Sequence, residues 1–133
     1  MKTKLRTVVL TLCLVVLMAS MAVSVLGAGA VFSNRFVYGG SFGYVASGTK
    51  ELETSTAAVY ISQIYKADGS SSDYWRLYAK ATSGGTSTKI TKGKSCDIEI
   101  PGMYQKAGSY VALYLKGHDS NLNCIVDGSW TVH

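Results

Sequence analysis

The sequence predicts an all-β domain, a small antiparallel β-sandwich or barrel-like fold of about seven or eight strands with one disulfide bond. Three observations predict it. Short segments alternate between apolar and polar residues, and no segment has sustained helical periodicity. Clusters of Gly, Ser, Asp and Lys separate these segments at spacings of roughly 8–12 residues. Two cysteines fall in the apolar phase of their segments.

Segments 74–81 and 109–116 show the most regular alternation. Their apolar phases, which should face the core, hold Trp75, Leu77, Ala79, Ala81, Val111, Leu113 and Leu115. The other predicted strands cover residues 57–66, 94–100, 121–127 and 129–132, with Asp127-Gly128 as a turn between the last two. In residues 57–66, Val59, Ile61 and Tyr65 share a phase. Residues 36–46 form two short strands or one glycine-kinked strand, and residues 49–56 a short helix or a loop.

The N-terminus has the order of a secretory signal peptide. Lys2, Lys4 and Arg6 precede a long apolar run, and small residues close it. We expect a signal over residues 1–30 and a single secreted β domain over residues 31–133.

Cleavage after Ala30 is the first expectation, and cleavage after Gly27 is the second. An uncleaved anchor is the alternative, because the run approaches the roughly 20 residues of a spanning helix. After cleavage, no stable membrane insertion is expected.

Cys96 and Cys124 are an even pair in a chain predicted to be exported, so a disulfide is expected between them. In the chain-entropy model it would stabilise the fold by about 3 kcal/mol. Two reduced thiols are the alternative. The pair lacks the further ligands that zinc requires, and we expect neither a metal nor a cofactor.

Charge disfavours nucleic acid as a partner. The whole chain carries a net charge of +5, but three of its thirteen basic residues lie in the predicted signal, which has no acidic residue. The remainder has ten basic and eight acidic residues. So small an excess gives little attraction to a phosphate backbone.

No catalytic constellation is visible. His118 lies in a predicted turn, and His133 is the last residue in the sequence. Asp119 begins a run of alternating oxygen ligands that resembles a calcium loop, but Cys124 stands where that loop needs glycine. We therefore expect a protein that is not an enzyme.

The most suggestive feature is a tyrosine-rich, basic face on the polar phase of the two clearest strands. If these strands share a sheet, the face offers aromatic and cationic contact for a sugar, a peptide or another protein. The alternative is that Tyr, Lys and Arg simply cover a sheet with their tips in water. The residues of this predicted face are Tyr74, Arg76, Tyr78, Lys80, Tyr110, Tyr114 and Lys116.

The organisation of the chain resembles that of small exported β-proteins of Gram-positive bacteria, with a long signal and a tail Gly128-Ser129-Trp130-Thr131. Tyr38-Gly39 and the segment YWRLYAKAT at residues 74–82 also resemble lactococcin 972-type bacteriocins. Those are small exported β-sandwich peptides that interfere with cell-wall synthesis. This likeness implies a sandwich fold and an antimicrobial role, and no site residue follows from it.

We thus expect a secreted, non-enzymatic binding or interaction protein that acts at or outside the cell envelope. Its expected partner is a cell-wall glycan or another surface protein. The alternative is a secreted bacteriocin-like or toxin-like antimicrobial protein, and a weaker third class is a hydrolase with an unfamiliar site.

Overall fold

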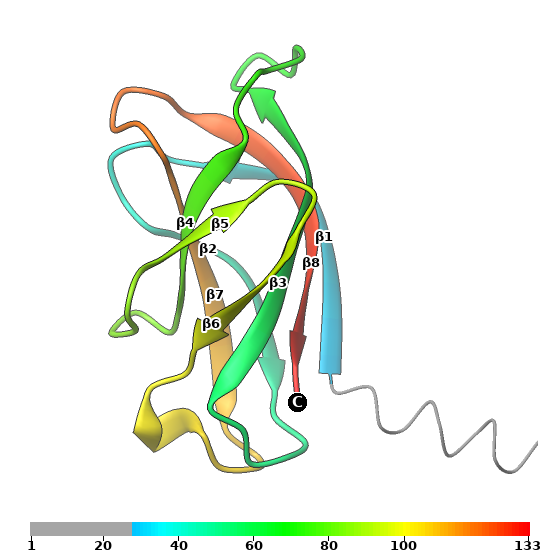
Figure 1. Cartoon of the computed structure of the whole chain (residues 1–133), viewed down its shortest axis with the longest axis vertical. Coiled ribbons are helices and arrows are strands. Elements are labelled where there is room, and N and C mark those ends of the chain that lie inside the picture. Colours follow the sequence, from blue (N-terminus) through cyan, green and yellow to red (C-terminus); the bar gives the residue numbers. More distant parts are fainter. Residues whose placement is uncertain (1–27) are drawn as a thin grey trace, which may run out of the picture.

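A computed structural model describes residues 28–133, which form an all-β, antiparallel fold (Figure 1). The fold class predicted from the alternating segments is confirmed. The strands are β1 (Ala28–Val37), β2 (Gly43–Thr49), β3 (Thr56–Lys66), β4 (Arg76–Ala81), β5 (Thr88–Thr91), β6 (Ser95–Glu99), β7 (Tyr110–Gly117) and β8 (Cys124–Val132). These residues contain no α-helix, and one 3₁₀ turn, η1 (Gly102–Tyr104), follows β6. The connection from β2 to β3 is a loop.

Two four-stranded sheets pack face to face as a sandwich. The first sheet has the order β1-β8-β3-β6, and the second has the order β2-β7-β4-β5. β1 pairs with β8, β2 with β7, β3 with β6 and β4 with β5. This is the strand pairing of a jelly roll. In that fold the chain forms one long antiparallel ribbon of strand pairs, and successive pairs along the ribbon belong alternately to the first and the second sheet. β4 and β7, from distant parts of the chain, thereby become neighbours.

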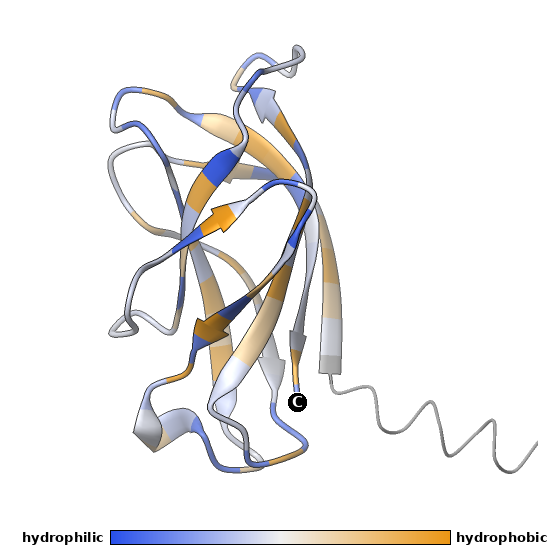
Figure 2. Cartoon of the chain, viewed as in Figure 1, coloured by the Kyte–Doolittle hydropathy of each residue, from blue (hydrophilic) through white to orange (hydrophobic). Residues whose placement is uncertain are grey.

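The core lies between the sheets and takes the apolar phase of the strands. β7 and β8 alternate strictly between buried and less buried residues, and Figure 2 shows apolar and polar residues alternating along the strands. The largest fully buried side chain is Trp130 of β8. The residues of β4 and β7 that were predicted to face the core are buried, namely Leu77, Ala79, Ala81, Val111, Leu113 and Leu115.

A β-bulge in β3 changes the predicted phase of that strand. Ile61 pairs with Gly128 and Gln63 with Asp127, which leaves Ser62 as an extra residue. An extra residue reverses the side on which all later side chains lie. Ile64 is therefore buried, and Tyr65 is not in the phase of Ile61 as the alternation had predicted.

The predicted turn at Asp127-Gly128 is wrong, because β8 runs through it as one strand. Gly128 instead serves a close approach between strands. A Cβ on Gly128 would stand 2.3 Å from the Tyr60 carbonyl oxygen and 2.9 Å from the Phe32 ring. Phe32 is thus packed directly over a backbone position that tolerates no side chain.

The predicted disulfide is also wrong, since Cys96 and Cys124 are both free thiols. β3 lies between their strands, with Cys96 opposite Val59 and Cys124 opposite Lys66. These two positions on β3 are about 23 Å apart at the usual rise of a strand. A disulfide requires Cα atoms within about 7 Å. Both cysteines face the core, as predicted, but at different ends of it.

β1 begins inside the predicted signal peptide. Ala28, Gly29 and Ala30 pair with the last residues of β8, and Ala30 packs against the core. The rest of the predicted signal, residues 1–27, lies outside the residues that the structure describes. Within residues 28–133, no helix has the length and apolarity to cross a membrane.

Candidate functional site

Six of the seven residues of the predicted face lie on the outer surface of the second sheet. β4 and β7 are adjacent, with Tyr78 opposite Lys116 and Lys80 opposite Tyr114. Because their neighbours along each strand are buried, these four side chains point away from the core. Arg76 of β4 and Tyr110 of β7 belong to the same outward phases.

Phe42 joins this surface from the connection between β1 and β2. The Nζ atoms of Lys80 and Lys116 lie 4.6 and 5.1 Å from the centre of the Phe42 ring. Lys116 also lies 5.4 Å from the centre of the Tyr78 ring. Such cation–π contacts hold both ammonium groups in place while leaving them charged.

Tyr44 of β2 and two tyrosines of β7, Tyr110 and Tyr114, contact one another on this surface. Tyr110 donates a hydrogen bond to the Ser47 hydroxyl at 2.6 Å, and that hydroxyl also lies 3.0 Å from the Tyr44 hydroxyl. The Tyr44 and Tyr114 rings meet edge to face. We call the whole outer surface the aromatic–basic face: Phe42, Tyr44, Arg76, Tyr78, Lys80, Lys89, Tyr110, Tyr114 and Lys116.

Charge distinguishes the two sheets sharply. The strands of the second sheet carry Arg76, Lys80, Lys89 and Lys116 and no acidic residue. The strands of the first sheet carry three acidic residues and two basic ones. The small positive excess of the domain is therefore concentrated on one side.

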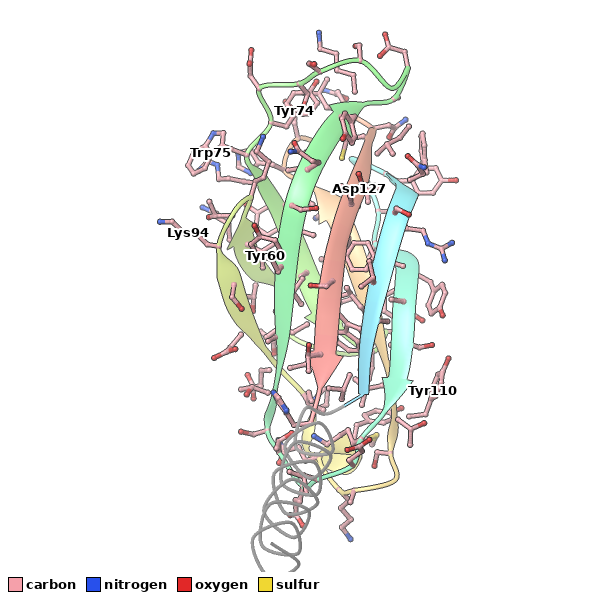
Figure 3. The ribbon with its side chains drawn as sticks, turned by 90° about the vertical axis from the view of Figure 1, so that its right-hand side faces the viewer. Tyr60, Tyr74, Trp75, Lys94, Tyr110 and Asp127 are labelled. Atoms are coloured by element: carbon pink, nitrogen blue, oxygen red, sulfur yellow. The ribbon has the colours of Figure 1, made fainter. Side chains whose placement is uncertain are left out.

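Tyr74 does not belong to the face, and Trp75 does not belong to the core, which corrects both predictions. β4 begins only at Arg76, so the alternation does not extend to these residues. Tyr74 packs against the core, whereas Trp75 is 52 % exposed. The Arg76 guanidinium carbon lies 4.1 Å from the centre of the Trp75 ring. Figure 3 shows Trp75 and Tyr110 near opposite ends of the molecule.

A pocket of about 190 Å³ opens where β4 begins and β7 ends. It is smaller than the roughly 300–1,000 Å³ of sites for drug-sized ligands, so it suits a single ring-sized group. His118 at its rim stacks on Tyr78 with ring centres 5.9 Å apart, which joins the pocket to the aromatic–basic face. Its lining consists of Asp73, Tyr74, Trp75, Arg76, Leu77, Gly117, His118, Asp119, Leu122 and Cys124.

Close backbone packing fixes one wall of the pocket. A Cβ on Gly39 would stand 2.3 Å from the Asp119 carbonyl oxygen. The Gly39 amide donates a hydrogen bond to the Asn123 side chain at 3.0 Å, and the Gly117 amide donates one to the Tyr38 carbonyl at 2.8 Å. Asp119 accepts a hydrogen bond from the Asn121 amide, so the turn that resembled a calcium loop is closed by its own side chain.

The pocket does not hold an activated nucleophile. Burial raises the pKa of the Cys124 thiol to about 11, so the sulfur is protonated at neutral pH. A reactive cysteine needs a lowered pKa. Among residues 28–133, no three His, Cys, Asp or Glu side chains are grouped so that they could hold a metal ion.

The buried basic residue Lys50 has a structural role. Its side chain is 2 % exposed, and its Nζ donates hydrogen bonds to the carbonyl and hydroxyl oxygens of Thr54. Burial lowers the pKa of Lys50, while the charge of Glu53 opposes that shift. The amine therefore closes the loop between β2 and β3 and is not open to a ligand.

The sequence analysis did not place Phe42 or His118 on this surface, and it placed Trp75 in the core. Phe42 and His118 lie in connections, where no periodicity indicates which way a side chain points. The Asn- and Asp-containing turn after β7 was the one signal that could have directed attention to this end of the sandwich.

The fold and its face define an eight-stranded jelly-roll domain with one aromatic, basic side. Comparisons of the chain with family models, with curated proteins and with solved structures give no match.

Proposed function

We propose that the chain is an exported, non-enzymatic binding protein that contacts an anionic component of the cell surface through its aromatic–basic face. The observation that carries the proposal is the charge of the second sheet, whose strands hold four basic residues, no acidic one, and interleaved aromatic rings. An anionic partner complements such a surface, and the rings supply apolar contact.

The arrangement of the cations supports a specific contact rather than general adhesion. The Lys80 and Lys116 ammonium groups are both held over Phe42, so ordering them in a complex loses little further entropy. The acidic residues of the strands all belong to the opposite sheet. Attraction is therefore directional, although the net charge of the domain is small.

A non-enzymatic role agrees with the chemistry of the pocket. Cys124 is held as a neutral thiol. Asp73 and Asp119, the two acidic residues that line the pocket, are both exposed to solvent. Export remains part of the proposal and rests on the signal-like order of residues 1–30.

The test is co-sedimentation of the purified protein with isolated bacterial envelopes. The face variant Tyr78→Ser/Tyr114→Ser/Lys116→Ser removes two rings and one charge from the aromatic–basic face. The matched control Phe36→Ser/Tyr60→Ser/Lys66→Ser likewise removes two aromatic rings and one positive charge, but from the first sheet, where Phe36 and Tyr60 are 42 % and 40 % exposed. We expect the face variant to lose most binding and the control to bind like the wild type. A folded face variant that sediments like the wild type overturns the proposal.

The bacteriocin-like alternative shares the same surface, since an antimicrobial protein also needs attraction to an anionic envelope. It predicts a further result, which is growth inhibition of related bacteria by the purified protein. Inhibition that the face variant loses would assign the antimicrobial role, whereas binding without inhibition favours the binding protein.

A further inference from the structure

The geometry points to the pocket beside β4 as a subsite for one neutral sugar ring of a glycan, whose anionic groups lie along the aromatic–basic face. This inference rests on the proposed function and names the class of partner. It is carried by the charges in the pocket, by the Trp75–Arg76 pair and by the continuity of pocket and face.

The pocket suits a neutral ligand that both donates and accepts hydrogen bonds. The residues that line it include one base, Arg76, and two acids, Asp73 and Asp119. The carboxylates disfavour an anion, and the guanidinium disfavours an amine. A ring with several hydroxyl groups can donate to the carboxylates and accept from the guanidinium. That is the hydrogen-bonding pattern of a sugar.

Trp75 and Arg76 supply the flat contact and an unused donor. The Nε atom of Arg76 is buried and has no hydrogen-bond partner among residues 28–133. Leaving a buried donor without an acceptor is unfavourable, so an acceptor from a ligand is stabilising. The half-exposed Trp75 ring lies over the guanidinium. The exposed part of this ring offers an aromatic surface to the apolar face of a sugar.

The pocket and the aromatic–basic face are continuous. His118 belongs to the pocket lining and stacks on Tyr78, and Lys116 lies over the same Tyr78 ring. An extended polymer can therefore place a neutral ring in the pocket and acidic groups against the lysines. The pocket is small enough that it holds only one ring of such a polymer.

The test measures tryptophan fluorescence and calorimetric affinity with three probes: a hyaluronan oligosaccharide, an uncharged chitin oligosaccharide and inorganic phosphate. Trp75 and Trp130 are the only tryptophans, and Trp130 is buried, so a spectral change reports on Trp75. The pocket variants are Trp75→Ala and Asp73→Asn. The control is Tyr60→Ala, an exposed ring on the other sheet.

We expect hyaluronan to bind most tightly and to change the fluorescence, chitin to bind more weakly, and phosphate not to change it. Trp75→Ala and Asp73→Asn should each weaken hyaluronan binding about tenfold, as loss of a central contact does, and Tyr60→Ala should not. Folded pocket variants that bind hyaluronan like the wild type overturn the subsite. So does a wild type that sediments with envelopes but binds neither oligosaccharide. In both cases the proposed function stands unless the face variant also keeps its envelope binding.

Discussion

Lys80 of β4 and Tyr114 of β7 are direct cross-strand neighbours on the outer side of the second sheet. Thirty-three residues separate them in the chain, and the jelly-roll pairing brings their strands together. One surface thus combines the outward residues of two strands.

Gly39 should be essential to the pocket wall. Replacing Gly39 by Ala places a Cβ against the Asp119 and Leu122 backbone, which has to shift. We expect Gly39→Ala to lower the free energy of unfolding by about 1–3 kcal/mol, as overpacking does. The control is Gly40→Ala, whose Cβ would stand 3.5 Å from the Ser120 carbonyl oxygen, an ordinary contact. Urea denaturation measures both, and equal stability of the two variants would contradict the close approach.

Cys96 and Cys124 should both be reduced thiols. Thiol titration of denatured protein with residues 28–133 should find two free thiols, and a reducing agent should leave the melting temperature unchanged. In the native protein, an alkylating agent should modify the half-buried Cys96 faster than the buried Cys124. A melting temperature that falls when a reducing agent is added would show that Cys96 and Cys124 form a disulfide.

Stability should fall at alkaline pH because of Cys124. Its pKa is raised from 9.0 to about 11, so the unfolded state releases the proton first as the pH rises. The contribution of the Cys124 thiol to the free energy of unfolding is therefore complete below pH 9. It is lost between about pH 9 and 11, at up to about 1.4 kcal/mol per pH unit. Lysines and tyrosines titrate in the same range, so the measurement is the difference in unfolding free energy between wild type and Cys124→Ala. A difference that does not change with pH refutes the prediction.

Thr82 should be a site of backbone strain. Its φ is 61°, its side chain is buried, and its hydroxyl has no hydrogen-bond partner among the described residues. A branched side chain in the left-handed region costs about 1–2 kcal/mol. We expect Thr82→Gly to raise the free energy of unfolding by about 1 kcal/mol, whereas Thr88→Gly, within β5, should lower it by a similar amount. A loss of stability in Thr82→Gly would show that the residue is not strained.

If the protein is exported as proposed, the N-terminus of the cleaved chain should be Ala28. Cleavage after Gly27 keeps the pairs that Ala28, Gly29 and Ala30 make with β8, whereas cleavage after Ala30 removes them. A chain of residues 28–133 should be about 1–3 kcal/mol more stable than one of residues 31–133, from lost hydrogen bonds and lost packing. N-terminal sequencing of secreted protein checks the site, and equal melting temperatures of the two chains would remove the structural argument for it.

The sequence predicted what depends on local alternation and missed what depends on register. Alternation correctly placed the core side of β4 and β7, because successive side chains in a strand point to opposite sides. It failed where a strand begins late, as at Trp75, and where a bulge intervenes, as at Ser62. The expected disulfide failed because facing the core does not place Cys96 and Cys124 at the same height in it. Phe42 reaches the face from a connection that carries no periodic signal.

The most direct test of the contact surface is a map of backbone amide shifts by nuclear magnetic resonance, recorded as soluble envelope polysaccharide is added to the purified protein. The account predicts that the largest shifts fall in β2, β4, β5 and β7, with Phe42 and His118, and that added salt reverses them as it screens the lysines. Shifts that gather on β1, β3, β6 and β8 instead would contradict it.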